Sequence, residues 1–119
     1  MRTLVVKLTC GAEAPERANQ ALTVAATAAV AGASVSLWLT GEAAWLAVPG
    51  RAADISLPHA VAMDALLEQV LAAGSVTVCS QCAVRRSLEE SDLLPGVRVA
   101  GAAAYVDEVL TDDVQALVY

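Results

Sequence analysis

The sequence predicts an α/β fold, a three-layer α/β/α sandwich built around a mainly parallel sheet of five strands. Two observations support this prediction. Short runs rich in Val, Leu and Thr alternate along the chain with longer Ala-rich segments, the pattern of strands joined by crossover helices. The length of 119 residues suits one hydrophobic core and leaves no room for a second, so we expect a single α/β domain over residues 1–119.

Turn-forming residues divide the chain into these elements. Pro15 stands at a favoured first helical position, and Gly32 and Gly74 provide helix ends. The stretch 47–57 contains a Pro-Gly pair and has no regular period, which makes it a candidate for a mobile loop over a site. We expect strands at residues 3–8, 34–40, 75–78, 97–100 and 115–118, and helices at residues 15–31, 58–73, 80–90 and 105–110.

The composition indicates which partners to expect. The net charge is −6 and the seven Lys and Arg residues are scattered, so no basic stripe is available for phosphates and we expect no nucleic-acid binding. Hydrophobic residues make up 57% of the chain, although aromatic residues make up only 3%. This share exceeds the ordinary level of about 45–50% and favours apolar surface buried between subunits. We therefore expect a homo-oligomer.

No segment has the pattern of a targeting or membrane-spanning sequence. The first ten residues hold a short apolar run interrupted by Lys7, with no cleavage site after it. Residues 18–41 are uncharged, but their pattern changes near Gly32 from helical to alternating, which indicates a helix, a turn and a strand. We expect a cytoplasmic protein without membrane contact, in which the three cysteines stay reduced.

Two of the cysteines lie three positions apart in the stretch SVTVCSQCAVRR, residues 75–86. Cys79 is expected to end a strand and open a helix, where backbone N–H groups and the helix dipole stabilise a thiolate. Cys82 and Arg86 follow at i+3 and i+7, so one helical face presents both sulfurs and a guanidinium, with Arg85 to one side. Such a guanidinium favours the thiolate and can hold an oxyanion or a partner's carboxylate. The cysteines fall beyond the carboxyl ends of the strands, where ligands bind in these sheets.

A cysteine pair has other interpretations. Free Cys is often a small buried hydrophobe. Zinc needs about four N or S ligands, which Cys10 and His59 would have to complete, and because their spacing does not require it we expect no metal; His59 fits better as a capping or surface residue. A thioredoxin-like site normally follows the first strand and has Pro inside the pair, whereas here the pair follows the third strand and encloses Ser80 and Gln81.

The same segment resembles the DsrE/DsrF/TusD-like proteins of bacterial and archaeal sulfur metabolism. In one branch of that family a strand ends in a Cys that is followed, after a small-residue stretch, by Arg-Arg-Gly. Cys79 with Arg85 and Arg86 keeps that spacing. The opening strand, the small-residue helix, the segment WLTGE at residues 38–42 and the return at residues 97–101 are also similar to the family layout.

The resemblance implies a flavodoxin-like (DsrE-like) domain that assembles into trimers or hexamers. It also implies that Cys79 accepts sulfur as a persulfide, like a sulfurtransferase, and that sulfur donor and acceptor proteins are the partners. The sequence departs from the family at Ser87, where Gly is common, and at Cys82, an added thiol. That thiol can attack a persulfide and release its sulfur as the pair closes to a disulfide. Cys10, after the first strand, is a candidate third sulfur or a structural residue.

Three functions from different classes follow. In a sulfur-trafficking protein Cys79 carries a persulfide, Cys82 resolves or shares it, and Arg86 with the helix start stabilises the anionic sulfur. A CxxC thiol–disulfide redox protein uses the same two cysteines, whereas a structural or interaction domain needs neither. The sequence has no GxGxxG, GxxxxGK[ST] or GxSxG motif, so we expect no nucleotide site, no serine hydrolase and no cofactor.

Overall fold

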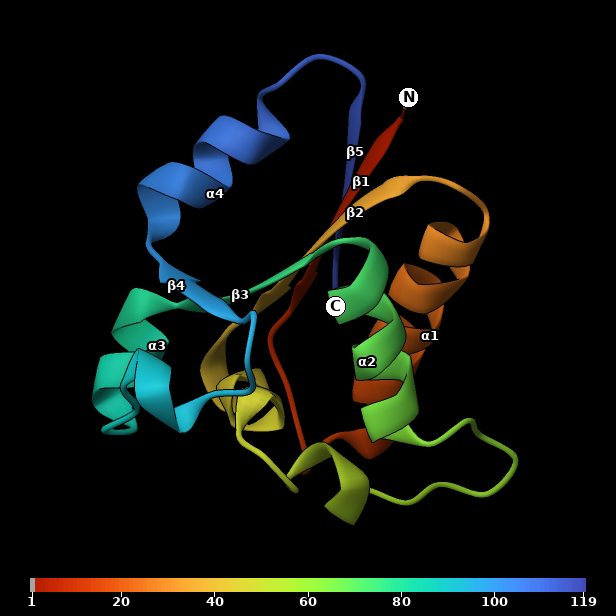
Figure 1. Cartoon of the computed structure of the whole chain (residues 1–119), viewed down its shortest axis with the longest axis vertical. Coiled ribbons are helices and arrows are strands. Elements are labelled where there is room, and N and C mark those ends of the chain that lie inside the picture. The colour runs from red at the N-terminus through yellow and green to blue at the C-terminus, as the bar shows by residue number, and fades with distance from the viewer. Residues whose placement is uncertain (1) are drawn as a thin grey trace.

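The computed structural model describes residues 2–119 and confirms the α/β fold class (Figure 1). Its strands are β1 (Thr3–Leu8), β2 (Ser34–Leu39), β3 (Ser75–Cys79), β4 (Arg98–Ala100) and β5 (Val114–Val118). Its α-helices are α1 (Pro15–Val30), α2 (Met63–Ala73), α3 (Ser80–Arg85) and α4 (Ala102–Val109). Three short 3₁₀ helices are η1 (Gly41–Ala47), η2 (Ala52–Asp54) and η3 (Glu90–Asp92).

The five strands are all parallel and lie in the order β4-β3-β2-β1-β5. The chain steps from β1 to β4 in one direction and then crosses back to place β5 beside β1. Parallel crossovers are right-handed, so the reversal of direction moves the last connection to the other face of the sheet. Helices α1 and α2 therefore cover one face, and α4 lies on the opposite side (Figure 1).

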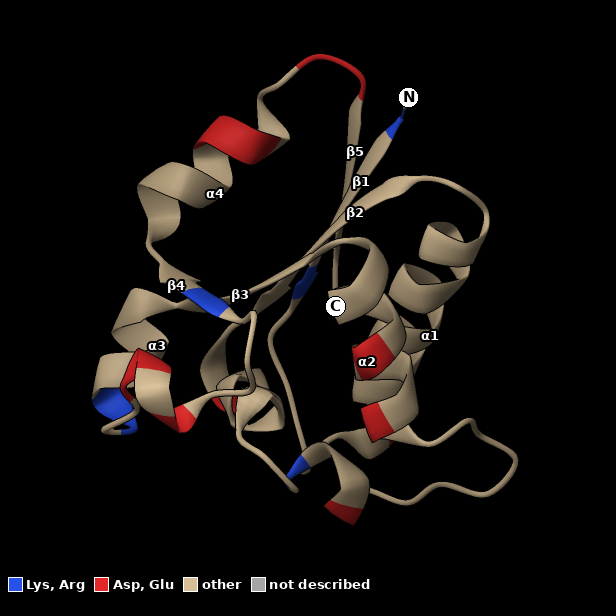
Figure 2. Cartoon of the chain, viewed as in Figure 1, with Lys and Arg blue, Asp and Glu red and all other residues tan. Residues whose placement is uncertain are grey.

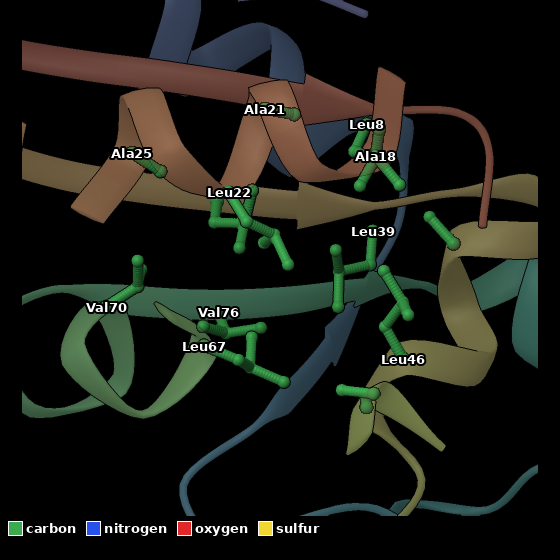
Figure 3. Close-up of a cluster of buried hydrophobic side chains, with 14 of the residues drawn as sticks. Leu8, Ala18, Ala21, Leu22, Ala25, Leu39, Leu46, Leu67, Val70 and Val76 are labelled. Carbon is green, nitrogen blue, oxygen red and sulfur yellow. The ribbon is translucent and has the colours of Figure 1, made fainter. Parts of the chain in front are cut away.

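The face beneath α1 and α2 carries the main core. Alternate residues of β1, β2 and β3 point into it, and Leu8, Leu39 and Val76 meet Leu22 of α1 and Leu67 of α2 (Figure 3). All five side chains are almost fully buried. Small alanines of α1, among them Ala18, Ala21 and Ala25, let the helix approach the sheet closely. Truncating one of the buried leucines to Ala should cost about 2–5 kcal/mol.

The opposite face carries polar side chains, several of which bond to one carboxylate of α4. Glu108 of α4 accepts hydrogen bonds from the hydroxyl of Ser36 and from Trp38 Nε1, the latter at 3.3 Å. Its other oxygen accepts from Arg98 Nη2 at 2.6 Å, while Arg98 Nε donates to Thr77 Oγ1 at 2.6 Å. Ser36 and Trp38 are buried, and buried donors need such an acceptor. Glu108 therefore fixes α4 to β2 and β4.

Charged residues occur mainly on the helices and loops (Figure 2), and the buried core of residues 2–119 contains none. The interior strands of the sheet are β1, β2 and β3, and Lys7 of β1 is their one charged residue. Its side chain lies on the α4 side of the sheet, where its Nζ is 5.0 Å from the ring centroid of Tyr105.

Helix boundaries differ from the sequence expectation where the backbone turns. The second helix begins at Met63 and not at residue 58, because His59 adopts φ 60 and interrupts the turn after Pro58. His59 accordingly lies in an exposed loop and not at a helix start. The third helix ends at Arg85, since Ser87 adopts φ 54. The last helix starts three residues earlier than expected, at Ala102.

The segment expected to be an irregular loop, residues 47–57, is partly packed. It contains η2, in which Ala52 is buried. Arg51 stacks on the ring of Trp45, with its guanidinium carbon 4.4 Å from the ring centroid. Within residues 2–119, no helix combines the length and the apolar character that crossing a bilayer would require.

Candidate functional site

Cys79 is the last residue of β3, and α3 begins at the next residue, as the sequence predicted. It lies at the carboxyl edge of the sheet, where β3 runs directly into α3 (Figure 1). Side chains alternate along a strand, so Cys79 shares a face with Thr77 and Ser75, the face on which α4 lies. The thiol is half-buried, which leaves it open to a reaction partner.

The surroundings of Cys79 favour its thiolate. Partial burial acts in the other direction and raises the pKa of the thiol. Hydrogen bonds from the backbone N–H and thiol of Cys82 and from the backbone N–H of Gln81, together with the positive charge of Lys7, outweigh it and bring the pKa below its usual value. Cys79 is therefore a thiol whose surroundings favour the thiolate form.

Cys82 is the inner sulfur of the pair. Its side chain is only 8% exposed, and its Sγ accepts a hydrogen bond from the backbone N–H of Gly41 at 3.1 Å. Gly41 opens η1 with φ 55, a conformation that glycine adopts without strain. The Gly41 N–H therefore ties η1 to the inner sulfur of the pair.

Arg86 lies beside the pair but is already bound. Its Nε and Nη2 donate to Glu42 Oε2 at 2.9 and 2.8 Å, and its Nη1 donates to the Cys82 carbonyl at 3.1 Å. These bonds tie the end of α3 to η1. Arg85 is exposed and borders a shallow surface hollow with Ser80 and Gln81, so the structure separates the two arginines by environment.

Cys10 has a different environment from the other two thiols. It is 4% exposed on the loop after β1, and its Sγ lies 3.9 Å from the Ala14 carbonyl oxygen. Burial raises the pKa of this thiol, against the lowering effect of Arg17, so it stays protonated at neutral pH. Across residues 2–119, no three His, Cys, Asp or Glu side chains come together as a metal ion would need. All three cysteines are free thiols.

Sequence reasoning missed two residues of this site. Lys7 lies near the end of a hydrophobic strand, and Gly41 belongs to the segment WLTGE, which carried a family resemblance but no role for the glycine. Strand register brings Lys7 level with Trp38 and Thr77, two residues short of Cys79. The role of Gly41 at the site follows only from the packing of η1 on α3, which brings its N–H to the Cys82 sulfur. The one available signal was a charged residue at a strand position that alternation assigns to a covered face.

Comparisons with known proteins agree with this fold. The model of the DsrE/DsrF-like family matches residues 4–115. MK0008, an uncharacterized protein of Methanopyrus kandleri, is 35% identical over 105 residues, which cover 85% of this chain and 84% of that protein. Among solved structures, the ychN protein of E. coli has a TM-score of 0.71 at 15% identity, covering 100% of this chain and 99% of that one. MTH1491 of Methanobacterium thermoautotrophicum has a TM-score of 0.68 at 11% identity, with 100% of both chains covered.

The last two similarities concern the fold alone, because the identities are low. The family match and the relative from Methanopyrus kandleri each extend over most of the sequence. The chain therefore belongs to the DsrE/DsrF-like family.

Proposed function

We propose that the protein traffics sulfur, with Cys79 accepting a sulfur atom as a persulfide and passing it to a partner protein. The observation that carries this proposal is the thiolate-favouring position of Cys79, at a strand end in a chain of the DsrE/DsrF-like family. Membership of that family suggests a role related to sulfur relay. A low pKa is what a sulfur acceptor needs, because the thiolate and not the thiol is the nucleophile.

Loading is a thiol exchange that conserves atoms and charge. The Cys79 thiolate attacks the outer sulfur of a donor persulfide, R–S–SH. A new S–S bond forms at Cys79, the old S–S bond breaks, and R–S⁻ leaves. Unloading repeats the step with the thiolate of an acceptor protein as the nucleophile.

Cys82 supplies a second way to unload. Its thiolate attacks the inner sulfur of the Cys79 persulfide, HS⁻ leaves, and a Cys79–Cys82 disulfide forms. A cellular dithiol then reduces that disulfide and restores both thiols. The placement of the two cysteines supports this step, since Cys79 directly precedes α3 and Cys82 lies in the first turn of that helix, which keeps the nucleophile near its target.

Incubation with a low-molecular-weight persulfide, followed by intact-mass measurement, tests the proposal. We expect the wild-type protein to gain the mass of one sulfur atom and Cys79→Ser to gain none. Cys10→Ser is the matched control, because it removes a buried thiol away from the pair and should load normally. A wild-type protein that gains neither the sulfur nor the Cys79–Cys82 disulfide under donor excess, or a Cys79→Ser variant that still loads, contradicts sulfur carriage on Cys79.

A thiol–disulfide redox function is the second candidate, and the same placement of Cys79 and Cys82 one helical turn apart favours it. Such a protein would form the disulfide from a partner's disulfide without any persulfide stage. The two candidates separate on the Cys82→Ser variant. A sulfur carrier still loads Cys79 in that variant, whereas a disulfide exchanger loses its product.

We further propose that the protein works in the reducing cytoplasm as a homo-oligomer, a trimer or hexamer, that meets sulfur donor and acceptor proteins. Free thiols at all three cysteines suit a reducing compartment. Support for self-association comes from β5, an edge strand whose Leu117 and Val118 are 39% and 64% exposed. Unpaired edges with exposed apolar side chains tend to pair with another chain.

A further inference from the structure

Lys7 carries a positive charge that no carboxylate neutralises. Within residues 2–119 the ion pairs are Arg86–Glu42 and Arg98–Glu108. Each of those arginines is held at 2.6–2.9 Å by its carboxylate. The half-buried Lys7 on β1 has no such partner, so its ammonium is the cation on this side of the sheet that is free to meet an anion.

Strand register places Lys7 and Cys79 on the same face. Lys7 pairs with Trp38 of β2, Trp38 pairs with Thr77 of β3, and Cys79 follows Thr77 by two residues. Two strand spacings of about 4.8 Å and two residue rises of about 3.3 Å put the two Cα atoms about 12 Å apart. The long stem of lysine and the side chain of cysteine then close most of that distance. The lowering of the Cys79 pKa by Lys7 agrees with this placement.

Helix α4 holds the ammonium in position. Lys7 Nζ lies 5.0 Å from the ring centroid of Tyr105, and the Tyr105 ring meets the buried Trp38 edge to face at 5.3 Å. Glu108, one turn further along α4, is fixed by hydrogen bonds to β2 and β4. A cation over an aromatic face is attracted to it. The hydrogen bonds of Glu108 fix α4, and α4 places the Tyr105 ring that holds the Lys7 ammonium.

We propose that Lys7 is the counter-ion of the sulfur anion on Cys79, as thiolate before loading and as persulfide after it, and that Tyr105 positions it. Of the other charged or titratable groups on the elements around Cys79, Arg86 is bound to Glu42 and Arg98 is bound to Glu108. Arg85 of α3 is exposed and is not among the groups that lower the Cys79 pKa, whereas Cys82 is. The thiolate step is independent of the proposed function, whereas the persulfide step rests on it.

The pH dependence of Cys79 alkylation by iodoacetamide, a neutral reagent, tests the thiolate step. The measurement uses the Cys10→Ser, Cys82→Ser background, in which a serine hydroxyl replaces the inner thiol as the donor and Cys79 is the remaining thiol. Lys7→Met should move the midpoint to higher pH and slow alkylation at pH 7 about twofold or more, the effect of one charge several ångströms away in a water-like dielectric. Lys7→Arg should restore the wild-type profile, because it keeps the charge.

Two substitutions of Tyr105, one that keeps the aromatic ring and one that removes it, test whether this residue positions Lys7. Tyr105→Phe keeps the ring beneath the ammonium and should leave the profile unchanged, whereas Tyr105→Leu should shift it in the direction of Lys7→Met. In the background protein with Lys7 intact, raising the salt concentration should also slow alkylation at pH 7, because salt screens the charge. This measurement needs no folded Lys7 variant. Equal profiles for the parent and Lys7→Met, or no salt effect, overturn the inference.

Persulfide loading of the same variants separates this inference from the proposed function. If Lys7→Met shifts the alkylation profile and also loads more slowly than Lys7→Arg, both steps are supported. If the alkylation profile shifts but no variant loads at all, the counter-ion role for the thiolate stands and the sulfur-carrier proposal falls. If all variants load but the alkylation profiles coincide, the sulfur carrier stands and the Lys7 role falls.

Discussion

Replacing Gly41 by Ala should destabilise the protein by about 2–4 kcal/mol, and most of that cost arises at one backbone contact. Gly41 has φ 55, which costs an L-residue about 1–2 kcal/mol. A Cβ added there would lie 2.8 Å from the carbonyl oxygen of Thr9, closer than real Cβ atoms come. The main chain must shift to relieve this overlap, at a typical cost of about 1–3 kcal/mol. Ala lowers the conformational entropy of the unfolded chain, which offsets about 0.4–1 kcal/mol of this loss of stability.

Gly50 is the matched control, because it also has a positive φ, 84, but no atom lies within 4 Å of its added Cβ. Gly50→Ala should therefore cost about 1 kcal/mol or less, the balance of strain against unfolded-state entropy. Equilibrium urea unfolding measures both variants. The difference between them isolates the contact with Thr9.

A functional measurement accompanies the unfolding experiment. The shift in main chain moves the Gly41 N–H, which donates to the Cys82 sulfur, so Cys82 should alkylate faster in Gly41→Ala than in Gly50→Ala. Equal free energies of unfolding for the two variants would show that the loop relaxes without cost, and the reasoning from the Thr9 contact would fail.

Three further outcomes test other parts of the structure. Glu108→Ala should lower the free energy of unfolding by about 1–3 kcal/mol in urea titrations, because it leaves Arg98 and two further donors without their acceptor; no loss would refute the clamp on α4. Burial raises the pKa of Cys10 in the folded protein above the ordinary thiol value of 9.0. The stability contributed by this protonated thiol is therefore complete below about pH 9 and is lost as pH rises through the pKa of the folded protein. Thermal melts of Cys10→Ala should lack that alkaline decline. Val118→Lys should reduce the mass measured by light scattering if β5 is the assembly edge; an unchanged oligomer would exclude it.

The sequence was sufficient for the fold because the fold depends on patterns that are local. Short β-rich runs and Ala-rich segments predicted all five strands and four helices, and β1 has the bounds of the β-rich run at residues 3–8. The predicted start of α2 was wrong because His59 adopts a positive φ, which no glycine or other turn signal in the sequence marks. Strand order was not predictable either, since the reversal after β4 depends on which edge α4 can reach.

The candidate site was predictable where it is contiguous in sequence. Cys79 and Cys82 are joined by one turn of helix, so their spacing alone brought them together. Lys7 and Gly41 reach the pair from β1 and η1, through strand register and loop packing that no spacing rule contains. Arg86 was predicted beside the sulfurs, and the structure adds its bond to Glu42, a contact across 44 residues.

The hydrogen bonds at the two sulfurs also indicate how a disulfide between them would behave. Backbone N–H groups and the charge of Lys7 stabilise the thiolate form of Cys79, and the Cys82 sulfur accepts a hydrogen bond from the Gly41 N–H. A disulfide is uncharged and a weak acceptor, so oxidation gives up these interactions. Dithiols whose reduced form is stabilised are the stronger oxidants. The reduction potential is about −270 mV for thioredoxin and rises to about −120 mV for a bacterial dithiol protein with a stabilised reduced form. We expect the potential of the pair, titrated against glutathione, to be less negative than that of thioredoxin, and to become more negative in Lys7→Met. A wild-type value at or below that of thioredoxin would contradict this, and a disulfide so stable would favour a structural bridge over a resolving thiol.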